Sequence, residues 1–298
     1  MDMSVNTNLA PAAIAGSTLA AVSAVPRRGA LYRVRHAGKT SYLFGTVHVG
    51  KQGYFPLEPE VTEALAASST LVVELDVREN EPFQLALAKY ARYAPGDSIR
   101  NHLSPASMMV LDGALRKANI PLSSVEGYKP WLVANILVGM EIERHGYQRS
   151  NGVEQFLLAT AKQQSKAVHE LESADYQLSL FDTLDDAEQE KYMLENLAEL
   201  ASGVALKKSA GLVDAWSVAD APAMAAAWRE LTSGDSVSAA FMDRTLLGKR
   251  NPEMANSIVN IMQTDQTAFV GVGLLHLIGE QGVPQLLRAR GYDVEKMY

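Results

Sequence analysis

The chain has 298 residues, no cysteine, and 34 acidic against 27 basic side chains, which gives a formal net charge of −7. Hydrophobic residues make up 47% of it and charged residues 20%, a globular composition that excludes general disorder. Without cysteine it has no disulfide framework or thiolate-bound metal, so any metal site must use histidine and carboxylate ligands. The acidic balance and the absence of basic clusters argue against nucleic-acid binding.

The first 26 residues differ from the rest of the chain. Residues 11–25 form a small-residue apolar stretch of signal-peptide length, and Val22-Ser23-Ala24 suits a signal peptidase. The stretch before it carries Asp2 and no basic residue, so a disordered alanine-rich tail is the alternative. Export predicts a periplasmic or secreted protein, and a plain tail leaves it cytoplasmic. No later stretch reaches the roughly 18–20 apolar residues of a membrane span, so we expect no transmembrane segment.

The first predicted elements are a hairpin and a βαβ unit. Residues 30–36 and 39–48 are rich in aromatic and β-branched side chains and predict two strands joined by Ala37-Gly38. Prolines that suit a first helical turn predict a helix over 56–67. The continuous apolar run at 70–75 predicts a strand buried on both faces, as in a parallel sheet.

The middle of the chain, from about residue 82 to residue 248, is mostly helical in pattern. Within it, residues 183–234 predict an extended set of helices broken near Gly211 and Pro222. The other expected elements are, in chain order, helices at 130–144 and 152–163, a strand at 166–171, a helix at 251–263, a strand at 267–276, a helix at 283–290 and a strand at 292–297.

These elements predict an α/β fold. We expect a central, mostly parallel or mixed sheet built from the N- and C-terminal segments, flanked by helices, with a large helical insertion. The whole of residues 27–298 is expected to form a single domain.

Two tetrapeptides of the pattern Gly-x-x-His, Gly45 to His48 and Gly273 to His276, each follow an apolar strand. Glu74 likewise ends a buried run. Because sites in open α/β sheets gather at the carboxyl ends of the strands, we expect His48, Glu74 and His276 to meet at one edge. Two imidazoles and a carboxylate suffice to bind a catalytic divalent metal with an open water position. The alternative is that each is an ordinary polar residue at a strand end.

The chain resembles the TraB/GumN/PrgY family, which includes the Tiki metalloproteases. The resemblance covers nearly everything from about residue 31 to residue 297. It is carried by the blocks 31–76, 249–262 and 269–294, with weaker landmarks at Lys129-Pro130-Trp131, Gly152-Val153-Glu154 and Leu171-Glu172.

The resemblance implies roles for particular residues. In Tiki-like members the two Gly-x-x-His motifs and a glutamate are implicated in metal-dependent peptide cleavage, which implies His48, His276 and Glu74 here. Arg250, which matches an arginine-asparagine pair of the family, would hold a substrate carboxylate or stabilise an oxyanion. The alternative for Arg250 is a surface or helix-cap residue. The family often has aspartate where this chain has Glu154, a departure from its pattern.

The function implied is a metal-dependent hydrolase that cleaves a peptide or another amide or ester bond. Its divalent metal (Mn, Co or Zn) would lie on His48, Glu74 and His276, and its partner would be a peptide or small-molecule substrate. The family is also similar in outline to erythromycin esterases and to haem-binding ChaN-like proteins. Two alternatives follow: a non-catalytic protein that sequesters a peptide signal or a haem-like ligand, and a metal-free esterase in which Glu74 holds a histidine as general base.

The other histidines show no such pattern. His169-Glu170 lacks the second histidine of His-Glu-x-x-His because Ser173 stands in its place. We expect His36, His102 and His145 to be solvated surface residues.

Overall fold

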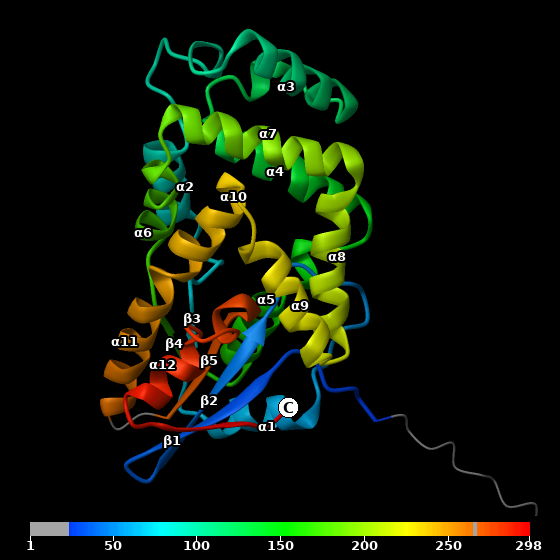
Figure 1. Cartoon of the computed structure of the whole chain (residues 1–298). Coiled ribbons are helices and arrows are strands. Elements are labelled where there is room, and N and C mark those ends of the chain that lie inside the picture. Colours follow the sequence, from blue (N-terminus) through cyan, green and yellow to red (C-terminus); the bar gives the residue numbers. More distant parts are fainter. Residues whose placement is uncertain (1–23, 265–266) are drawn as a thin grey trace, which may run out of the picture.

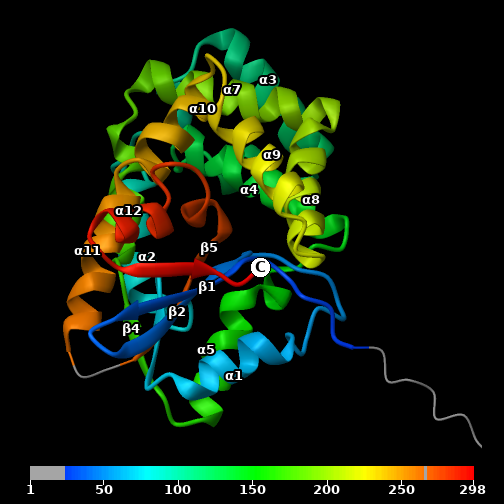
Figure 2. The same ribbon diagram turned by 60° about the horizontal axis from the view of Figure 1, so that its bottom comes forward.

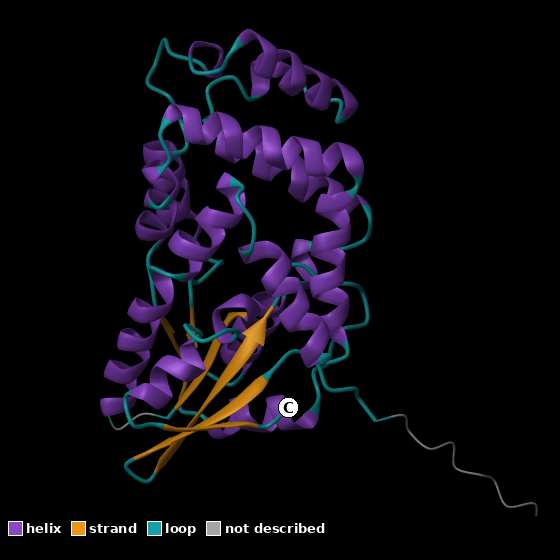
Figure 3. Cartoon of the chain, viewed as in Figure 1, coloured by secondary structure: helices purple, strands orange, loops and turns teal. Residues whose placement is uncertain are grey.

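The computed structural model describes residues 24–264 and 267–298. The signal-like stretch up to residue 23 lies outside the described residues, so the prediction made for it remains a prediction. The described chain has two layers (Figure 1): a sheet with its covering helices, and a helical layer that lies beyond one end of the strands. All strands lie in the first layer, and the second is built of helices and loops (Figure 3).

The sheet has six strands in the order β4-β3-β5-β2-β1-β6. The first four in this order are parallel to one another, and at one edge β1 pairs antiparallel with β2 and β6 pairs antiparallel with β1. This confirms the α/β class and the mixed sheet. The strands are β1 (Leu31–His36), β2 (Lys39–Thr46), β3 (Thr70–Val73), β4 (Ala167–Glu170), β5 (Ala268–Gly273) and β6 (Asp293–Lys296).

The buried strands are explained by their sequences. Every residue of β3 (TLVV) and of β5 (AFVGVG) is buried, as expected of parallel strands covered on both faces. The hairpin between β1 and β2 turns at Ala37 and Gly38, whose φ angles of 48° and 76° fit a two-residue turn.

Two pairs of helices cover the two faces of the sheet (Figure 2). One face carries α1 (Pro59–Ala67) and α5 (Val153–Gln163), and the other carries α11 (Arg250–Gln263) and α12 (Val283–Ala289). The helix predicted from residue 56 begins at Pro59, since the preceding residues form an irregular turn.

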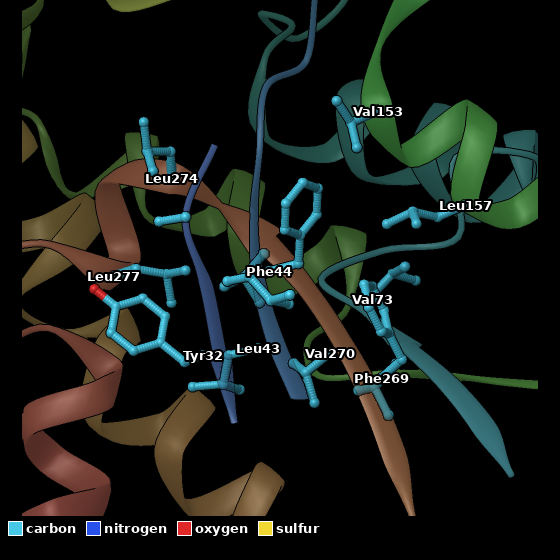
Figure 4. Close-up of a cluster of buried hydrophobic side chains, with 14 of the residues drawn as sticks. Tyr32, Leu43, Phe44, Val73, Val153, Leu157, Phe269, Val270, Leu274 and Leu277 are labelled. Carbon is cyan, nitrogen blue, oxygen red and sulfur yellow. The ribbon is translucent and has the colours of Figure 1, made fainter. Parts of the chain in front are cut away.

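The core lies between the sheet and these helices (Figure 4). Leu157 of α5 and the pair Leu274 and Leu277 lie on the two sides of β2 in this view. Phe44 of β2 is fully buried, with its ring centroid 6.1 Å from that of Phe269. Large, closely packed side chains hold the ends of the central strands in fixed positions.

The helical layer is the predicted insertion, and it has its own core. Trp131 and Phe181 stack there with ring centroids 4.2 Å apart, beside Tyr192 and Phe241. Its helices are α2 (Asn80–Tyr90), α3 (Pro105–Lys117), α4 (Pro130–Arg144), α6 (Ala174–Ser179), α7 (Asp186–Ser202) and α10 (Val237–Ala240). Two more helices of the insertion, α8 (Val204–Ser217) and α9 (Ala221–Thr232), connect it to the sheet and bury their side chains in the core of the sheet. The short turns are η1 (Ile99–Asn101), η2 (Leu122–Ser124), η3 (Arg149–Asn151), η4 (Phe181–Thr183), η5 (Phe241–Leu247, a π-helix) and η6 (Leu274–Leu277).

One predicted helix break is wrong. Gly211 lies inside α8, and the chain turns instead at Gly203, whose φ of 78° ends α7 in the left-handed conformation. Pro222 does mark a boundary, because it lies in the first turn of α9 behind the N-cap Asp220. Within the described residues no helix is long and apolar enough to cross a bilayer.

Candidate functional site

His48, Glu74 and His276 converge on the backbone of Gly273. A Cβ atom at Gly273 would lie 3.1 Å from Glu74 Oε1, 3.5 Å from His276 Cδ2 and 3.6 Å from His48 Nε2. The topology explains this, because β2, β3 and β5 are parallel neighbours and Thr46 at the end of β2 pairs with Gly273. The structure therefore brings the three side chains together, as the strand-end pattern predicted, and Gly273 keeps the space between them open because it has no side chain.

His276 is not on the strand predicted for it. β5 ends at Gly273, and the chain then forms the 3₁₀ turn η6, which carries His276 back over the strand end. The imidazole is 5% exposed. The turn thus places a buried nitrogen beside Glu74, where a straight strand would carry it onward.

Glu74 is held from two sides. Its Oε1 accepts the Gly273 backbone N–H at 2.5 Å, and its Oε2 accepts Nη2 of Arg250 at 2.6 Å. Arg250 also donates to Glu172, with Nε 3.0 Å from Oε1 and Nη2 2.7 Å from Oε2. Burial opposes ionisation of Glu74, but the positive charges beside it, Arg250 among them, prevail and lower its pKa. Glu74 is therefore an anion at neutral pH.

Arg250 is not a surface residue. It begins α11, is 9% exposed and lies between the carboxylates of Glu74 and Glu172. Both carboxylates accept hydrogen bonds from Arg250. Arg250 is not among the described residues that line the cavity beside the site, which is described below. Its geometry suits holding Glu74 in place better than direct contact with a substrate.

Asn251 determines the tautomer of His276. Its Nδ2 donates to the backbone carbonyl of Gln281 at 2.9 Å, and a carbonyl can only accept. Its Oδ1 therefore faces His276 Nδ1, 2.6 Å away, and that nitrogen must carry the proton. Burial lowers the pKa of His276 to about 4 despite the nearby Glu74 charge, so the ring is neutral at pH 7 and its Nε2 keeps a lone pair.

Glu154 orients His48 in a similar way. It lies in the first turn of α5, and its Oε1 accepts from Thr46 Oγ1 at 2.5 Å and lies 3.0 Å from His48 Nδ1. The charge of Glu154 is the main reason that the pKa of His48 rises, to about 9. Gly152 permits the approach, since a Cβ there would lie 2.6 Å from the His48 carbonyl oxygen.

A cavity of about 920 Å³ opens beside these residues. His48, Glu74 and Glu154 line it, and 72% of the His48 side chain is exposed there. Its volume lies within the range of clefts that bind small molecules and short peptide segments. The site thus has a reachable face, formed by His48 and Glu74, and a buried one, formed by His276.

The chemistry of the donor atoms fits a divalent cation. His276 Nε2 lies 3.7 Å from Glu74 Oε1, and both are acceptors, so a cation between them would relieve their repulsion. The other nitrogen of each imidazole is held by Asn251 or Glu154, as metal-binding histidines usually are. Yet in residues 24–264 and 267–298 no three histidine, aspartate or glutamate side chains are spaced as the ligands of one ion.

Two of the residues that complete the site were not assigned a role by sequence reasoning. Glu154 was noted only as part of a family landmark where the family often has aspartate, although Thr46 and His48, two residues apart at one strand end, lie on the same side and can share a partner. Gln177 of α6 donates to Glu172 at 2.8 Å and had no sequence signal, because the insertion brings it there.

The sequence matches the TraB/PrgY/gumN family over residues 30–296. Among curated relatives, a Shigella flexneri protein named "Uncharacterized protein YbaP" is 25% identical over 248 residues, which cover 83% of this chain and 88% of that one. A protein of the same name from Escherichia coli (strain K12) is 25% identical over 247 residues, covering 83% and 87% of the two chains. No solved structure matches.

Proposed function

The chain belongs to the TraB/PrgY/gumN family, and we propose that it is a metal-dependent hydrolase that cleaves a peptide or another amide or ester bond. The observation that supports this best is the convergence of His48 Nε2, Glu74 Oε1 and His276 on Gly273, beside an open cavity. His48, Glu74 and His276 would hold Mn, Co or Zn once their side chains close around the ion, since in the described residues they are not spaced as the ligands of one ion. Such a metal, when bound, lowers the pKa of water and polarises a carbonyl.

The surrounding residues prepare these three side chains. Glu154 accepts from His48 Nδ1 and Asn251 accepts from His276 Nδ1, so His48 presents Nε2 towards Gly273 and His276 presents Nε2 towards Glu74 Oε1. Arg250 keeps Glu74 ionised and oriented. Held side chains of this kind lower the cost of ordering a site when a ligand binds.

Metal analysis tests the proposal directly. The purified protein should contain, or take up on addition of Mn, Co or Zn, one divalent ion per chain, and His48→Ala and His276→Ala should both lose it. His145→Ala is the matched control, because that exposed ring bonds only to residues of its own helix, through Glu141. A wild-type protein that binds none of the three metals would overturn the metal mechanism.

Turnover then separates an enzyme from a sequestering protein. Cleavage of a peptide library by the wild type should rise in proportion to metal occupancy. Tight binding of peptides at full occupancy, with no cleavage, would instead support the sequestering function.

The pair formed by His48 and Glu154 favours a second candidate, a metal-free hydrolase in which Glu154, and not Glu74, holds the histidine. The raised pKa of His48, about 9, makes the metal-free ring a cation at neutral pH, so a metal would have to displace its Nε2 proton and a general base would act only at higher pH. This enzyme would therefore be insensitive to chelators, and its rate would increase through about pH 9.

A further inference from the structure

Two apolar side chains close behind Glu74 face the cavity without being part of the core. Val77 and Phe83 are 50% and 40% exposed, and both line the cavity. The two hydrophobic cores formed by the described residues include neither of them. Large apolar groups left exposed on a hollow surface are typical of a binding site for an apolar ligand group.

Their position in the chain ties them to the site. Val77 lies in the loop between β3 and α2, three residues after Glu74, and Phe83 lies in the first turns of α2. On the same helix Leu85 is 65% exposed, but it is not among the described residues that line the cavity. The side chains of Phe83 and Leu85 therefore point in different directions, and only that of Phe83 faces the cavity.

Other apolar side chains extend this surface. All but the exposed Pro82 are half-buried, and they come from several elements, so the surface is a shaped wall of the cavity. The additional apolar lining residues are Val49, Leu75, Pro82, Ile142 and Val168.

The charged groups of the same cavity are mostly acidic. Its one lining arginine, Arg149 in the described chain, is paired with Glu143 at 3.2 Å. The lining carboxylates belong to Glu74, Asp76, Glu79, Glu154 and Glu170. Glu74, Asp76 and Glu154 are paired with Arg250, Arg78 and His48, so the excess negative charge of the lining lies on Glu79 and Glu170. A ligand that carries a carboxylate beside these two would meet repulsion.

We propose that the cavity selects peptides with a bulky apolar side chain, which packs against Val77 and Phe83, and that it rejects peptides with an acidic residue at that position. This inference rests on the proposed function for its link to cleavage, since the packed residue would lie beside the bond presented to His48 and Glu74. Binding alone can be measured without any turnover.

The test is calorimetric binding of capped nonapeptides that share one neutral sequence and differ at the central position, which is leucine, phenylalanine, alanine or glutamate. His48→Ala protein serves as the receptor, so that cleavage does not interfere. We expect the leucine and phenylalanine peptides to bind at least about tenfold more tightly than the alanine peptide, and the glutamate peptide to bind most weakly.

Phe83→Ser and Val77→Ser, each added to His48→Ala, should reduce this preference to less than about threefold. Leu85→Ser is the matched control, a still more exposed apolar residue of α2, and should leave the preference unchanged. All three serine changes are at exposed positions, and circular dichroism checks that the fold is retained.

Equal affinity for all four peptides, binding of none, or a preference that survives Phe83→Ser would overturn the proposal. Failure of the hydrolase proposal gives a different result. In that case the leucine peptide binds with the expected preference, but metal-loaded wild-type protein leaves it uncleaved.

Discussion

The side-chain oxygen of Asn251 accepts a hydrogen bond from His276 Nδ1 at 2.6 Å, and this single contact determines where the proton of the imidazole lies. Asn251 cannot turn over, because its amide nitrogen is bonded to the carbonyl of Gln281. The lone pair of His276 is consequently directed at Glu74, the anion 3.7 Å away.

Asn251→Ala should weaken metal binding by about 10–100-fold, because the imidazole loses the partner that orients it. It should also cost about 1–3 kcal/mol of unfolding free energy, since a buried donor is left unpaired. Metal titration and urea denaturation measure the two effects. Asn260→Ala, at an exposed position of the same helix, should change neither. Unchanged metal affinity in Asn251→Ala would contradict the assigned tautomer.

Arg250→Ala should be among the most destabilising single changes near the site. It leaves two buried carboxylates, Glu74 and Glu172, facing each other without a cation, and breaking a buried ion pair of this kind costs about 3–5 kcal/mol. Arg144→Ala removes an exposed pair with Glu141 and should cost less than about 1 kcal/mol. Equal unfolding free energies for the two variants, measured in urea, would show that the buried network does not form.

Gly273→Ala should impair the site while sparing the fold. The new methyl group would lie 3.1 Å from Glu74 Oε1 and 3.6 Å from His48 Nε2, so these side chains must move apart. We expect metal affinity or turnover to fall by about tenfold to a hundredfold, and unfolding free energy to fall by less than about 1.5 kcal/mol.

The matched glycine control is Gly113→Ala. A Cβ at Gly113, within α3, meets nothing within 4 Å, so this change should stabilise the protein by about 0.5–1 kcal/mol and leave the site unaffected. If Gly273→Ala binds metal like the wild type, His48, Glu74 and His276 do not share one ligand.

His102 should give the protein a pH-dependent contribution to stability. Its two ring nitrogens each lie 2.8 Å from a carboxylate oxygen, of Asp186 and of Asp97, and its ring stacks on Tyr93. The bond to Asp186 is the largest cause that raises the pKa of His102, with Asp97 adding to it. The expectation that this residue is simply solvated is therefore wrong.

Because the folded protein holds the His102 proton more tightly than the unfolded chain does, the stabilisation is complete below the unfolded pKa of about 6.5 and is lost as pH rises through the folded pKa. Wild type and His102→Gln should thus differ most in unfolding free energy near about pH 5.5 and converge at alkaline pH. A constant difference across this range would contradict the ion pairs. NMR titration of the ring gives its pKa independently.

Much of the fold could be predicted from the sequence because short stretches of residues determine its strands and helices. The runs at β3 and β5 are continuously apolar, and Pro130 and Asp185 start helices by capping chemistry that acts over a few residues. The failed break at Gly211 shows the limit of this reasoning. A glycine can be tolerated inside a helix at modest cost, and of the two glycines it is Gly203, in the left-handed conformation, that ends α7.

The site was predictable in part for the same reason. Strand ends brought His48, Glu74 and His276 together through a general rule of α/β sheets. Glu172 lies two residues after β4 and so obeys the same rule, whereas the position of Glu154 depends on where α5 packs, which no local pattern encodes. The contact between Glu154 and His48 therefore needed the three-dimensional structure.

The position of β5 in the sheet has a consequence for the order of folding. β5 is made late in the chain, yet it lies between β2 and β3, which are made early and do not pair with each other in the described sheet. During synthesis about 190 residues are therefore added after β3 before β5 can join the two early strands. Glu74 acquires its backbone donor, Gly273, only when β5 inserts between β2 and β3. The same step brings Gly273 beside His48. A partly made chain of this protein has no site with which to act.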